Sequence, residues 1–280
     1  MFFIVGELIN STRKPVGQAI SKRDVEYIRG LARRQHAAGA DVIDLNAGQS
    51  MERELADLLW LIDVVEDELG SDVRLAIDTS DPGVMEKAIS RCSAPPFINS
   101  ISNEPAKEAL IGIAAGFACE VIGLAMGERG MPKTADDRLA ETAALVEKCE
   151  KAGVALDRLY IDLVCMSVAS SPEQGRELLE AVRRVKVELT VKTLVAVSNV
   201  SFGLPNRRLL NRTFLAMLIE AGLDGAILDP TDAEITDILC AALALTGADE
   251  FCMNYIQHQR AKQRGQSFIR GDLIEERRPV

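Results

Sequence analysis

Eight short apolar runs alternate with amphipathic segments along the 280 residues of this chain, and this alternation most constrains its fold. The runs are apolar throughout rather than at every second position, which is typical of parallel strands covered on both faces. We predict strands at residues 2–9, 41–47, 73–80, 96–102, 119–126, 159–164, 192–197 and 225–230. Eight strand–helix units in about 250 residues predict an α/β fold, a closed (β/α)8 TIM barrel, with a doubly wound open sheet as the alternative.

Helical periodicity and helix-breaking residues define the segments between the strands. Apolar residues recur with the spacing of one helix face from Met51 to Leu69, and Gly70 ends that helix. Further helices are predicted at residues 24–38, 82–91, from 105 onward, 135–151, 172–188, 207–220 and 232–245. No domain boundary interrupts this pattern, so residues 1–252 are expected to form one barrel. Beyond Cys252 the pattern decays, and residues 253–280 are expected to be a polar C-terminal tail.

The composition argues against several classes of function. A net charge of −10 argues against nucleic-acid binding, because affinity for a phosphate backbone comes largely from clustered Lys and Arg. No apolar run reaches the ~20 residues of a membrane-spanning helix and the start lacks signal-peptide features, so a cytoplasmic protein without membrane contact is expected. The six scattered cysteines and two histidines offer neither zinc nor iron–sulfur spacing, so no metal is expected.

Polar side chains follow the predicted strands where each strand turns into a loop. Because the carboxyl ends of TIM-barrel strands converge on the face that carries active sites, these side chains are expected to form one ring at the barrel mouth. The ring contains no histidine base, no cysteine in a reactive motif and no lysine at a strand end. Carboxylates and amides favour a flat, neutral heterocycle rich in donors and acceptors over hydrolysis. The members are Glu7, Asn10, Asp44, Asn46, Asp78, Asn99, Asp162, Asn199 and Asp229.

Several ring residues also have a structural interpretation. Asp44 and Asp229 could cap the helices that follow their strands, and for Asp229 capping is as good an interpretation as ligand binding. Asp78 competes for a capping role with two later residues, which leaves its own carboxylate freer. Asp162 has no helix directly after it, so its carboxylate is expected at the mouth without a capping role. A magnesium or calcium site built from the clustered carboxylates ranks lower.

The stretch from Lys192 to Arg212 reads as a buried strand that ends in a small polar corner before Gly203 breaks the pattern. Asn199 lies in this corner and is expected at the end of the seventh strand. A loop with Met126 and Met131 follows the fifth strand, where methionines pack in the loop or form an adaptable lid over the mouth.

Six motifs along the chain resemble those of a known family: GELIN, DLNAG, AIDTS, INSIS, YIDLV and VSNVSFGLPNRRLLNRTFLA. Together, over Ile4 to about Cys252, they resemble the methyltetrahydrofolate:corrinoid methyltransferases, pterin-binding barrels of dihydropteroate synthase-like fold. This family includes the corrinoid iron–sulfur protein methyltransferase and the folate domain of cobalamin-dependent methionine synthase. The resemblance implies methyl transfer between 5-methyltetrahydrofolate or tetrahydrofolate and the cobalt of a corrinoid (cobalamin) on a separate protein, and a homodimer.

The resemblance also implies roles for particular ring residues. Asp78, Asn99 and Asp162 would hold the pterin ring, and Asn199 would also bind it near the methyl-bearing nitrogen and act in catalysis. Other members carry an amide or polar group three residues after this asparagine, where this chain has Phe202. The further candidates for the site are Glu7, Asn10, Asp44, Asn46, Phe202, Arg207 and Asp229.

Two other functions remain as alternatives. Dihydropteroate synthases share the pterin mouth, but DLNAGQSMERE stands here where they normally carry a GESTRPG-like phosphate loop, which counts against pterin synthesis. The second alternative is a folate-binding subunit or scaffold without activity of its own. No cobalamin-binding motif of the DxHxxG type is present, so the corrinoid is expected on a partner protein.

Overall fold

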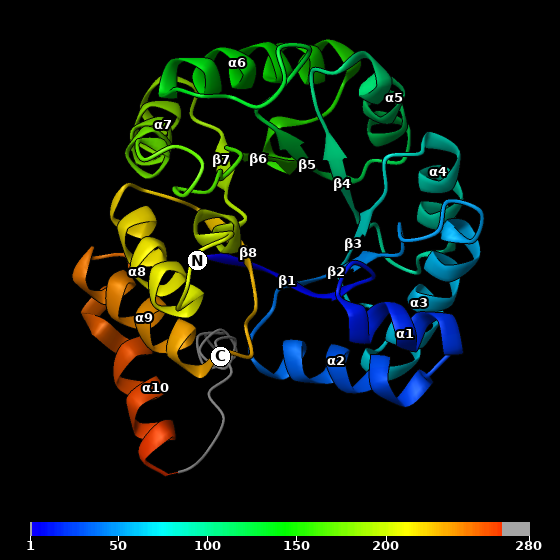
Figure 1. The fold of residues 1–280 in the computed structure, drawn as a ribbon, viewed down its shortest axis with the longest axis horizontal. Helices are drawn as coiled ribbons and strands as arrows, with labels where there is room; N and C mark the ends of the chain where they lie inside the picture. The colour runs from blue at the N-terminus through cyan, green and yellow to red at the C-terminus, as the bar shows by residue number, and fades with distance from the viewer. Residues whose placement is uncertain (1, 265–280) are drawn as a thin grey trace, which may run out of the picture.

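The computed structural model describes residues 2–264, in which eight parallel strands form a ring covered by helices (Figure 1). Each strand pairs with the next in sequence, and β1 also pairs with β8. Between β7 and β8 the ring closes through one bridge, Ala196 to Ile227, so the barrel is nearly closed and the predicted (β/α)8 fold is confirmed. The strands are β1 (Phe3–Asn10), β2 (Val42–Asn46), β3 (Leu75–Asp78), β4 (Phe97–Ile101), β5 (Glu120–Leu124), β6 (Leu159–Asp162), β7 (Lys192–Leu194) and β8 (Gly225–Leu228).

Eight helices follow the strands as predicted and cover the outer face of the barrel (Figure 1). Several of their starts are capped by side chains: Asp81 accepts the amides of Gly83 and Val84 at the start of α4, and Thr134 forms a capping box at the start of α6. The helices are α2 (Val25–Ala37), α3 (Glu54–Leu69), α4 (Pro82–Arg91), α5 (Glu108–Gly116), α6 (Ala135–Ala152), α7 (Gln174–Glu188), α8 (Arg207–Glu220) and α9 (Ala233–Leu245). Short 3-10 turns are η1 (Pro105–Lys107), η2 (Leu156–Arg158), η3 (Val197–Ser201) and η4 (Glu250–Cys252).

The loop after β1 contains a helix that the sequence did not predict, α1 (Lys14–Lys22). Pro15 lies in its first turn, where a missing amide proton costs nothing. Gly17 is buried, and a Cβ there would lie 2.7 Å from the carbonyl oxygen of Ser11. Pro15 is thus compatible with the start of the helix, and Gly17 lets the helix pack closely against the loop that follows β1.

The seventh strand is shorter than predicted, and this corrects the expected position of Asn199. β7 ends at Leu194, the carbonyl of Val195 accepts the amide of Ile227 at 2.9 Å, and the chain then turns into η3. Val197 is only 1% exposed although it lies outside the strand. Burial of the turn explains why the apolar run extended beyond the strand. Asn199 therefore lies in a 3-10 turn above the barrel.

The tail expected from residue 253 begins with a further helix, α10 (Met253–Gln263), which packs against α9. The buried carboxylate of Asp249 accepts the backbone amides of Asn254 at 3.0 Å and Tyr255 at 2.9 Å. These bonds fix the start of α10, so the first part of the expected tail is ordered against the barrel. Residues 265–280 of that tail lie outside the described residues. Within residues 2–264, no helix combines the length and apolarity needed to span a bilayer.

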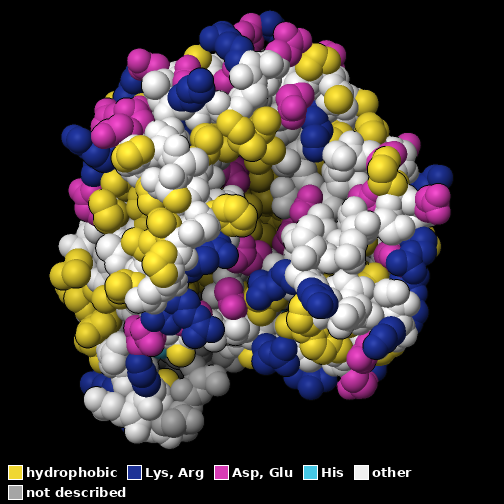
Figure 2. All heavy atoms as spheres, in the orientation of Figure 1, with side chains coloured by type: hydrophobic (Ala, Val, Ile, Leu, Met, Phe, Trp, Pro, Cys, Tyr) yellow, Lys and Arg dark blue, Asp and Glu magenta, His cyan; other side chains and the backbone are white. Residues whose placement is uncertain are grey.

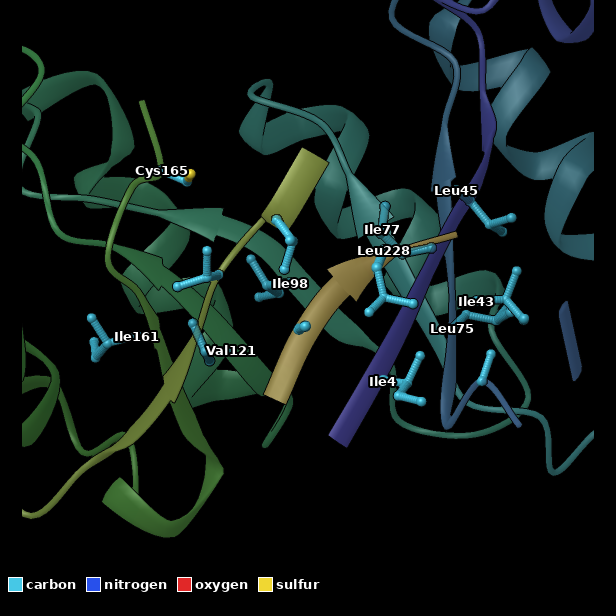
Figure 3. Close-up of a cluster of buried hydrophobic side chains, with 14 of the residues drawn as sticks. Ile4, Ile43, Leu45, Leu75, Ile77, Ile98, Val121, Ile161, Cys165 and Leu228 are labelled. Carbon is cyan, nitrogen blue, oxygen red and sulfur yellow. The ribbon is translucent and has the colours of Figure 1, made fainter. Parts of the chain in front are cut away.

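Two apolar layers support the barrel. The larger layer lies between strands and helices and includes Ile4, Ile43, Leu75, Ile98 and Val121 (Figure 3). The smaller layer fills the barrel interior. Because side chains alternate faces along a strand, the residue two positions after an interior side chain also points inward, nearer the mouth. In six strands that next residue is polar: the pairs are Val5 with Glu7, Val42 with Asp44, Ala76 with Asp78, Phe97 with Asn99, Tyr160 with Asp162, and Ile227 with Asp229.

Candidate functional site

The barrel mouth is hollowed, with acidic side chains inside the hollow and Lys and Arg side chains beside it (Figure 2). Two cavities open there, of about 540 Å3 and about 380 Å3, within the usual range of small-molecule sites. The larger is lined in part by Glu7, Asn10, Ser198, Arg207 and Asp229. The smaller is lined in part by Met126, Met131, Asp162, Asn199 and Phe202.

Four ring residues form two hydrogen-bonded pairs, one between the adjacent strands β2 and β3 and one that spans from β4 to β2. Nδ2 of Asn99 donates to Oδ1 of Asp44 at 2.9 Å, and Nδ2 of Asn46 donates to Oδ2 of Asp78 at 3.0 Å. Oδ1 of Asn46 accepts the hydroxyl of Ser11 at 2.8 Å, which fixes the orientation of this amide. Each carboxylate uses one oxygen in its pair, which leaves one oxygen of Asp44 and one of Asp78 outside these two bonds.

Burial perturbs the acidity of these carboxylates. Burial and the nearby charge of Asp78 raise the pKa of Asp44 well above its ordinary value, against the hydrogen bond from Asn99. Burial also raises the pKa of Asp78, while the bond from Asn46 and the charge of Lys107 oppose that rise. A ligand that donates hydrogen bonds to these oxygens would stabilise their ionised form. Neither residue caps a helix, since Asp81 caps α4 and Arg53 occupies the N-cap position of α3.

Asp162 lies at the end of β6 and is 5% exposed. Its Oδ1 accepts the backbone amide of Val164 at 2.8 Å, and burial raises the pKa of Asp162 to about 6. Val164 adopts a left-handed backbone with φ of 56°, which is costly for a β-branched residue. As predicted, no helix begins directly after this strand. One carboxylate oxygen of Asp162 is nevertheless already used in the hydrogen bond from the Val164 amide.

A fully buried arginine holds the loop after β6 in place. Arg138 of α6 donates to the carbonyl oxygens of Leu163 at 2.7 Å and Val164 at 3.0 Å, and to Oε1 of Gln174 at 2.8 Å. These bonds clamp the two residues that follow Asp162. The strained Val164 conformation, and with it the amide that Asp162 accepts, is thus fixed by the neighbouring helices α6 and α7.

Glu7 is the ring residue best suited to exchange protons at neutral pH. Burial raises its pKa to about 7, with Asp229 adding to this rise and Arg13 and Arg207 opposing it. The hydroxyl of Ser198 lies 3.4 Å from Oε2 of Glu7. A carboxyl group whose pKa lies near the working pH can act as a general acid or base.

Asn10 and Asp229 organise the loops beside Glu7. Oδ1 of Asn10 accepts the hydroxyl of Thr12 at 2.7 Å, and Oδ1 of Asp229 accepts the hydroxyl of Thr231 at 2.6 Å. The N-cap of α9 is Asp232. The capping interpretation of Asp229 is therefore wrong, and its carboxylate instead shapes the turn at the rim of the larger cavity.

Asn199 is exposed on η3, and within residues 2–264 its side chain forms no hydrogen bond. Phe202, three residues on, is 70% exposed, and Met131 across the smaller cavity is 55% exposed. Arg207 holds η3 by donating to the carbonyl of Ser198 at 2.7 Å and the hydroxyl of Ser201 at 3.1 Å. The Asn199 amide is therefore presented to the mouth by a turn that is itself fixed.

Sequence reasoning missed the residues that support the ring from loops and helices. Lys107 of η1 donates to the carbonyl of Ser100 at 3.1 Å, its charge acts on Asp78, and burial lowers the pKa of Lys107. Lys107 and Arg138 do not lie at strand ends, so the strand-end rule could not find them, whereas Ser11 directly follows β1 and was overlooked. Within residues 2–264, no group of three or more His, Cys, Asp or Glu side chains is arranged to hold a metal ion.

Fold and site together define a (β/α)8 barrel whose mouth carries a ring of carboxylate and amide side chains. The family model described as pterin binding enzyme matches residues 6–229. The methylcorrinoid:tetrahydrofolate methyltransferase of Eubacterium limosum is 30% identical over 258 residues, covering 90% of this chain and 94% of that protein. The chain belongs to the pterin-binding enzyme family.

Further comparisons agree with this assignment. The methionine synthase of Mycobacterium tuberculosis is 26% identical over 239 residues, which cover 80% of this chain and 20% of that enzyme. Two solved structures share the fold. A dihydropteroate synthase of Coxiella burnetii in complex with pteroic acid has a TM-score of 0.65 at 17% identity, covering 89% of this chain and 94% of that chain. A Yersinia pestis DHPS with a pterine-sulfa conjugate has a TM-score of 0.66 at 18% identity, covering 88% of this chain and 93% of that chain. The fold is therefore dihydropteroate synthase-like, as predicted.

Proposed function

We propose that this protein is a methyltransferase that moves a methyl group between 5-methyltetrahydrofolate, or tetrahydrofolate, and the cobalt of a corrinoid on a separate protein. Two observations together carry the proposal: the polar mouth of the barrel, and a match that covers 94% of the length of a methylcorrinoid:tetrahydrofolate methyltransferase. No residue of this chain is proposed to hold the corrinoid. The corrinoid enters with a partner and is a substrate of the reaction.

Asp78, Asn99 and Asp162 would bind the pterin ring. A carboxylate accepts two parallel hydrogen bonds from an amino-pyrimidinone edge, and an amide both donates and accepts against adjacent ring atoms. Support comes from their position above the interior apolar layer on β3, β4 and β6, and from the orientation that Asp44 and Asn46 impose on the pairs. The raised pKa values of Asp78 and Asp162 reflect burial that a donating ligand would offset.

Activation of the methyl group requires a proton at the nitrogen that carries it. A tertiary amine leaves poorly until it gains positive charge, so interactions that strengthen as the carbon–nitrogen bond breaks contribute most to the rate. We propose that the Asn199 amide stabilises the protonated nitrogen and that Glu7, with a pKa of about 7, holds the proton. Ser198 connects the two, because its hydroxyl approaches Glu7 and its neighbour is Asn199.

The partner would approach the apolar side of the mouth. Met131 and Phe202 are exposed there, above the cavity that Asp162 and Asn199 line. Phe202 stands where the resemblance implies a polar group, so we propose that it contributes contact surface in place of a hydrogen bond. We further propose that the protein acts in the cytoplasm and as a homodimer, for which exposed apolar side chains on α8 to η4 offer a surface: Leu209, Met217, Leu245 and Phe251.

Free reduced cobalamin offered with 5-methyltetrahydrofolate tests the proposal, because it replaces the partner. Absorbance spectra should show the loss of reduced cobalamin and the appearance of methylcobalamin at a rate proportional to protein concentration. A folate-binding subunit would bind 5-methyltetrahydrofolate in a calorimeter without methylating cobalt. A dihydropteroate synthase-like enzyme would instead condense a pterin diphosphate with p-aminobenzoate, so that activity in place of methylation would refute the proposal.

A further inference from the structure

Lys107 of η1 is anchored where β3 and β4 lie side by side at the barrel mouth. Its Nζ donates to the carbonyl oxygen of Ser100 at 3.1 Å, and Ser100 is a buried residue of β4. The residue before it is the uncharged Asn99, which is aligned with Asp78 of β3 in the register of the two strands. The ammonium group is therefore fixed at the junction that carries two of the proposed pterin-binding residues.

Two carboxylates and one ammonium group act on Asp78. Asp44 of β2 interacts with Asp78 by charge, and Glu54, the first residue of α3, adds a second negative charge. Lys107 and the amide of Asn46, which donates to Asp78 at 3.0 Å, act in the opposite direction. Burial and the two carboxylates thus favour a protonated Asp78, whereas the lysine and the amide favour its ionised form.

The charge of Lys107 is held at this position without a direct ion pair. Within residues 2–264 its Nζ has no carboxylate at salt-bridge distance, and its hydrogen bond is to a carbonyl. Glu104 acts on Lys107 by charge, but Oε2 of Glu104 accepts the hydroxyl of Ser102 at 3.0 Å. Burial lowers the pKa of Lys107, and the charges of Asp78 and Glu104 oppose this. Lys107 and Asp78 therefore stabilise each other's charged form.

We propose that Lys107 is a positioning residue for the pterin, which keeps the Asp78 carboxylate ionised before the substrate binds and fixes the part of β4 that carries Asn99. This inference rests on the proposed function. An amino-pyrimidinone edge donates hydrogen bonds, so it requires an ionised carboxylate, which only accepts them. A protonated Asp78 would direct a hydroxyl donor at the donors of the ring, and binding would first require the loss of that proton. The charge of Lys107 removes this requirement in advance.

A double-mutant cycle in binding calorimetry with 5-methyltetrahydrofolate tests the inference. Lys107→Met should weaken binding at pH 7 by about tenfold, within the usual range of coupling between residues of one charge network. In an Asp78→Asn background no carboxylate remains for the lysine to stabilise, so the same substitution should change Kd by less than about twofold. Lys107→Arg should retain tight binding, because it keeps the charge. The matched control is Lys151→Met on α6, an exposed lysine paired with Glu147, which should leave Kd unchanged.

The pH dependence of Kd separates an effect of charge from an effect of shape. Binding that requires ionised Asp78 is present above the pKa of this group and is lost as pH falls through it. Removal of the ammonium group raises that pKa further, so Lys107→Met should lose binding at a higher pH than the wild type. Lys107→Gln, which keeps a donor for Ser100 without the charge, should show the same displacement, and Lys107→Arg should follow the wild-type profile.

The outcomes separate this inference from the proposed function. An unchanged Kd in Lys107→Met, or an equal loss of affinity with and without the Asp78 carboxylate, would overturn the positioning role alone. Wild-type pH profiles in Lys107→Gln and Lys107→Met would do the same. Thermal unfolding shows which variants are folded, and Lys107→Gln carries the test where Lys107→Met is not. Absence of 5-methyltetrahydrofolate binding by the wild-type protein would overturn the proposed function and the positioning role together.

Discussion

Replacement of Arg138 by Met is the change that best probes how the loop after β6 is held. Arg138 is 0% exposed and donates to the carbonyls of Leu163 and Val164 and to Gln174. Met fills similar volume without any donor. The variant therefore leaves the acceptors buried without these bonds, while Asp162 and the other ring residues stay unchanged.

The size of the effect follows from the orphaned acceptors. A buried acceptor without a partner costs about 1–3 kcal/mol, so two carbonyls cost about 4 kcal/mol, and removal of a buried charge offsets roughly 1 kcal/mol of this. A net loss of about 3 kcal/mol corresponds to a fall in Tm of about 6–12 °C for a chain of this length. Val164 is strained at φ of 56°, so without the hydrogen bond from Arg138 its backbone should relax. This relaxation should also move the Val164 amide that donates to Asp162.

Folate binding as a function of pH separates this positioning role from a loss of stability. Burial raises the pKa of Asp162 to about 6, while the Val164 amide and the charge of Arg138 hold it from rising further. Binding that needs the ionised carboxylate is present above this pKa and is lost as pH falls through about 6. In Arg138→Met both opposing effects weaken, so the midpoint of this loss should move upward.

Calorimetric titrations of the folded variant with 5-methyltetrahydrofolate, from pH 5 to pH 8, measure that midpoint. Arg138→Lys serves as the control, because it keeps the charge and part of the hydrogen bonding and should lie between the variant and the wild type. A Met variant with the wild-type Tm and an unshifted binding midpoint would refute the role assigned to Arg138.

The remaining predictions concern the ring itself. Asp78→Ala and Asp162→Ala should each weaken binding of 5-methyltetrahydrofolate by about 100-fold, on the scale of a lost charged hydrogen bond, and tight binding by both in a calorimeter would contradict the pterin assignment. Glu7→Gln should lower the rate of methyl transfer to cobalamin and flatten its pH profile near 7, whereas an unchanged profile would exclude Glu7 as the proton carrier. The ligand-free protein should become more stable as pH falls from 7 toward 5, because the pKa values of Glu7 and Asp162, about 7 and about 6, lie above their ordinary values, and each contributes up to about 3 kcal/mol that is lost as pH rises. Urea unfolding at the two pH values measures this, and a decrease in stability toward pH 5 would show that these groups are not buried as carboxyls.

The barrel was predictable because its strands and helices differ in period and length along the chain. The prediction was wrong where buried apolar residues lie outside the strands. Val197 is buried in a 3-10 turn, so an apolar run extended the seventh strand too far. Gly17 and Pro15 concealed α1, since both residues are common in loops and their fit here depends on contacts with β1 and its loop.

The ring was predictable because strand ends converge in this fold and because a period of two places six of its polar residues above interior apolar ones. The pairing within the ring was not predictable. Asn99 donates to Asp44 across 55 residues of sequence, and Arg138 reaches Leu163 from a neighbouring helix. Such contacts depend on the distances between elements, which no local pattern records. The roles of Asp78, Asn99, Asp162 and Asn199 toward a ligand stay predictions.

The central claim is that Asn199, presented to the mouth by η3, activates the methyl-bearing nitrogen of a pterin held by the ring. Methyl transfer from 5-methyltetrahydrofolate to reduced cobalamin by Asn199→Ala, measured beside its calorimetric Kd for 5-methyltetrahydrofolate, tests this claim most directly. We expect the rate constant at saturation to fall about 100-fold while the Kd rises less than tenfold, since a contact made mainly in the transition state affects rate more than binding. A variant that transfers the methyl group at the wild-type rate would contradict the account.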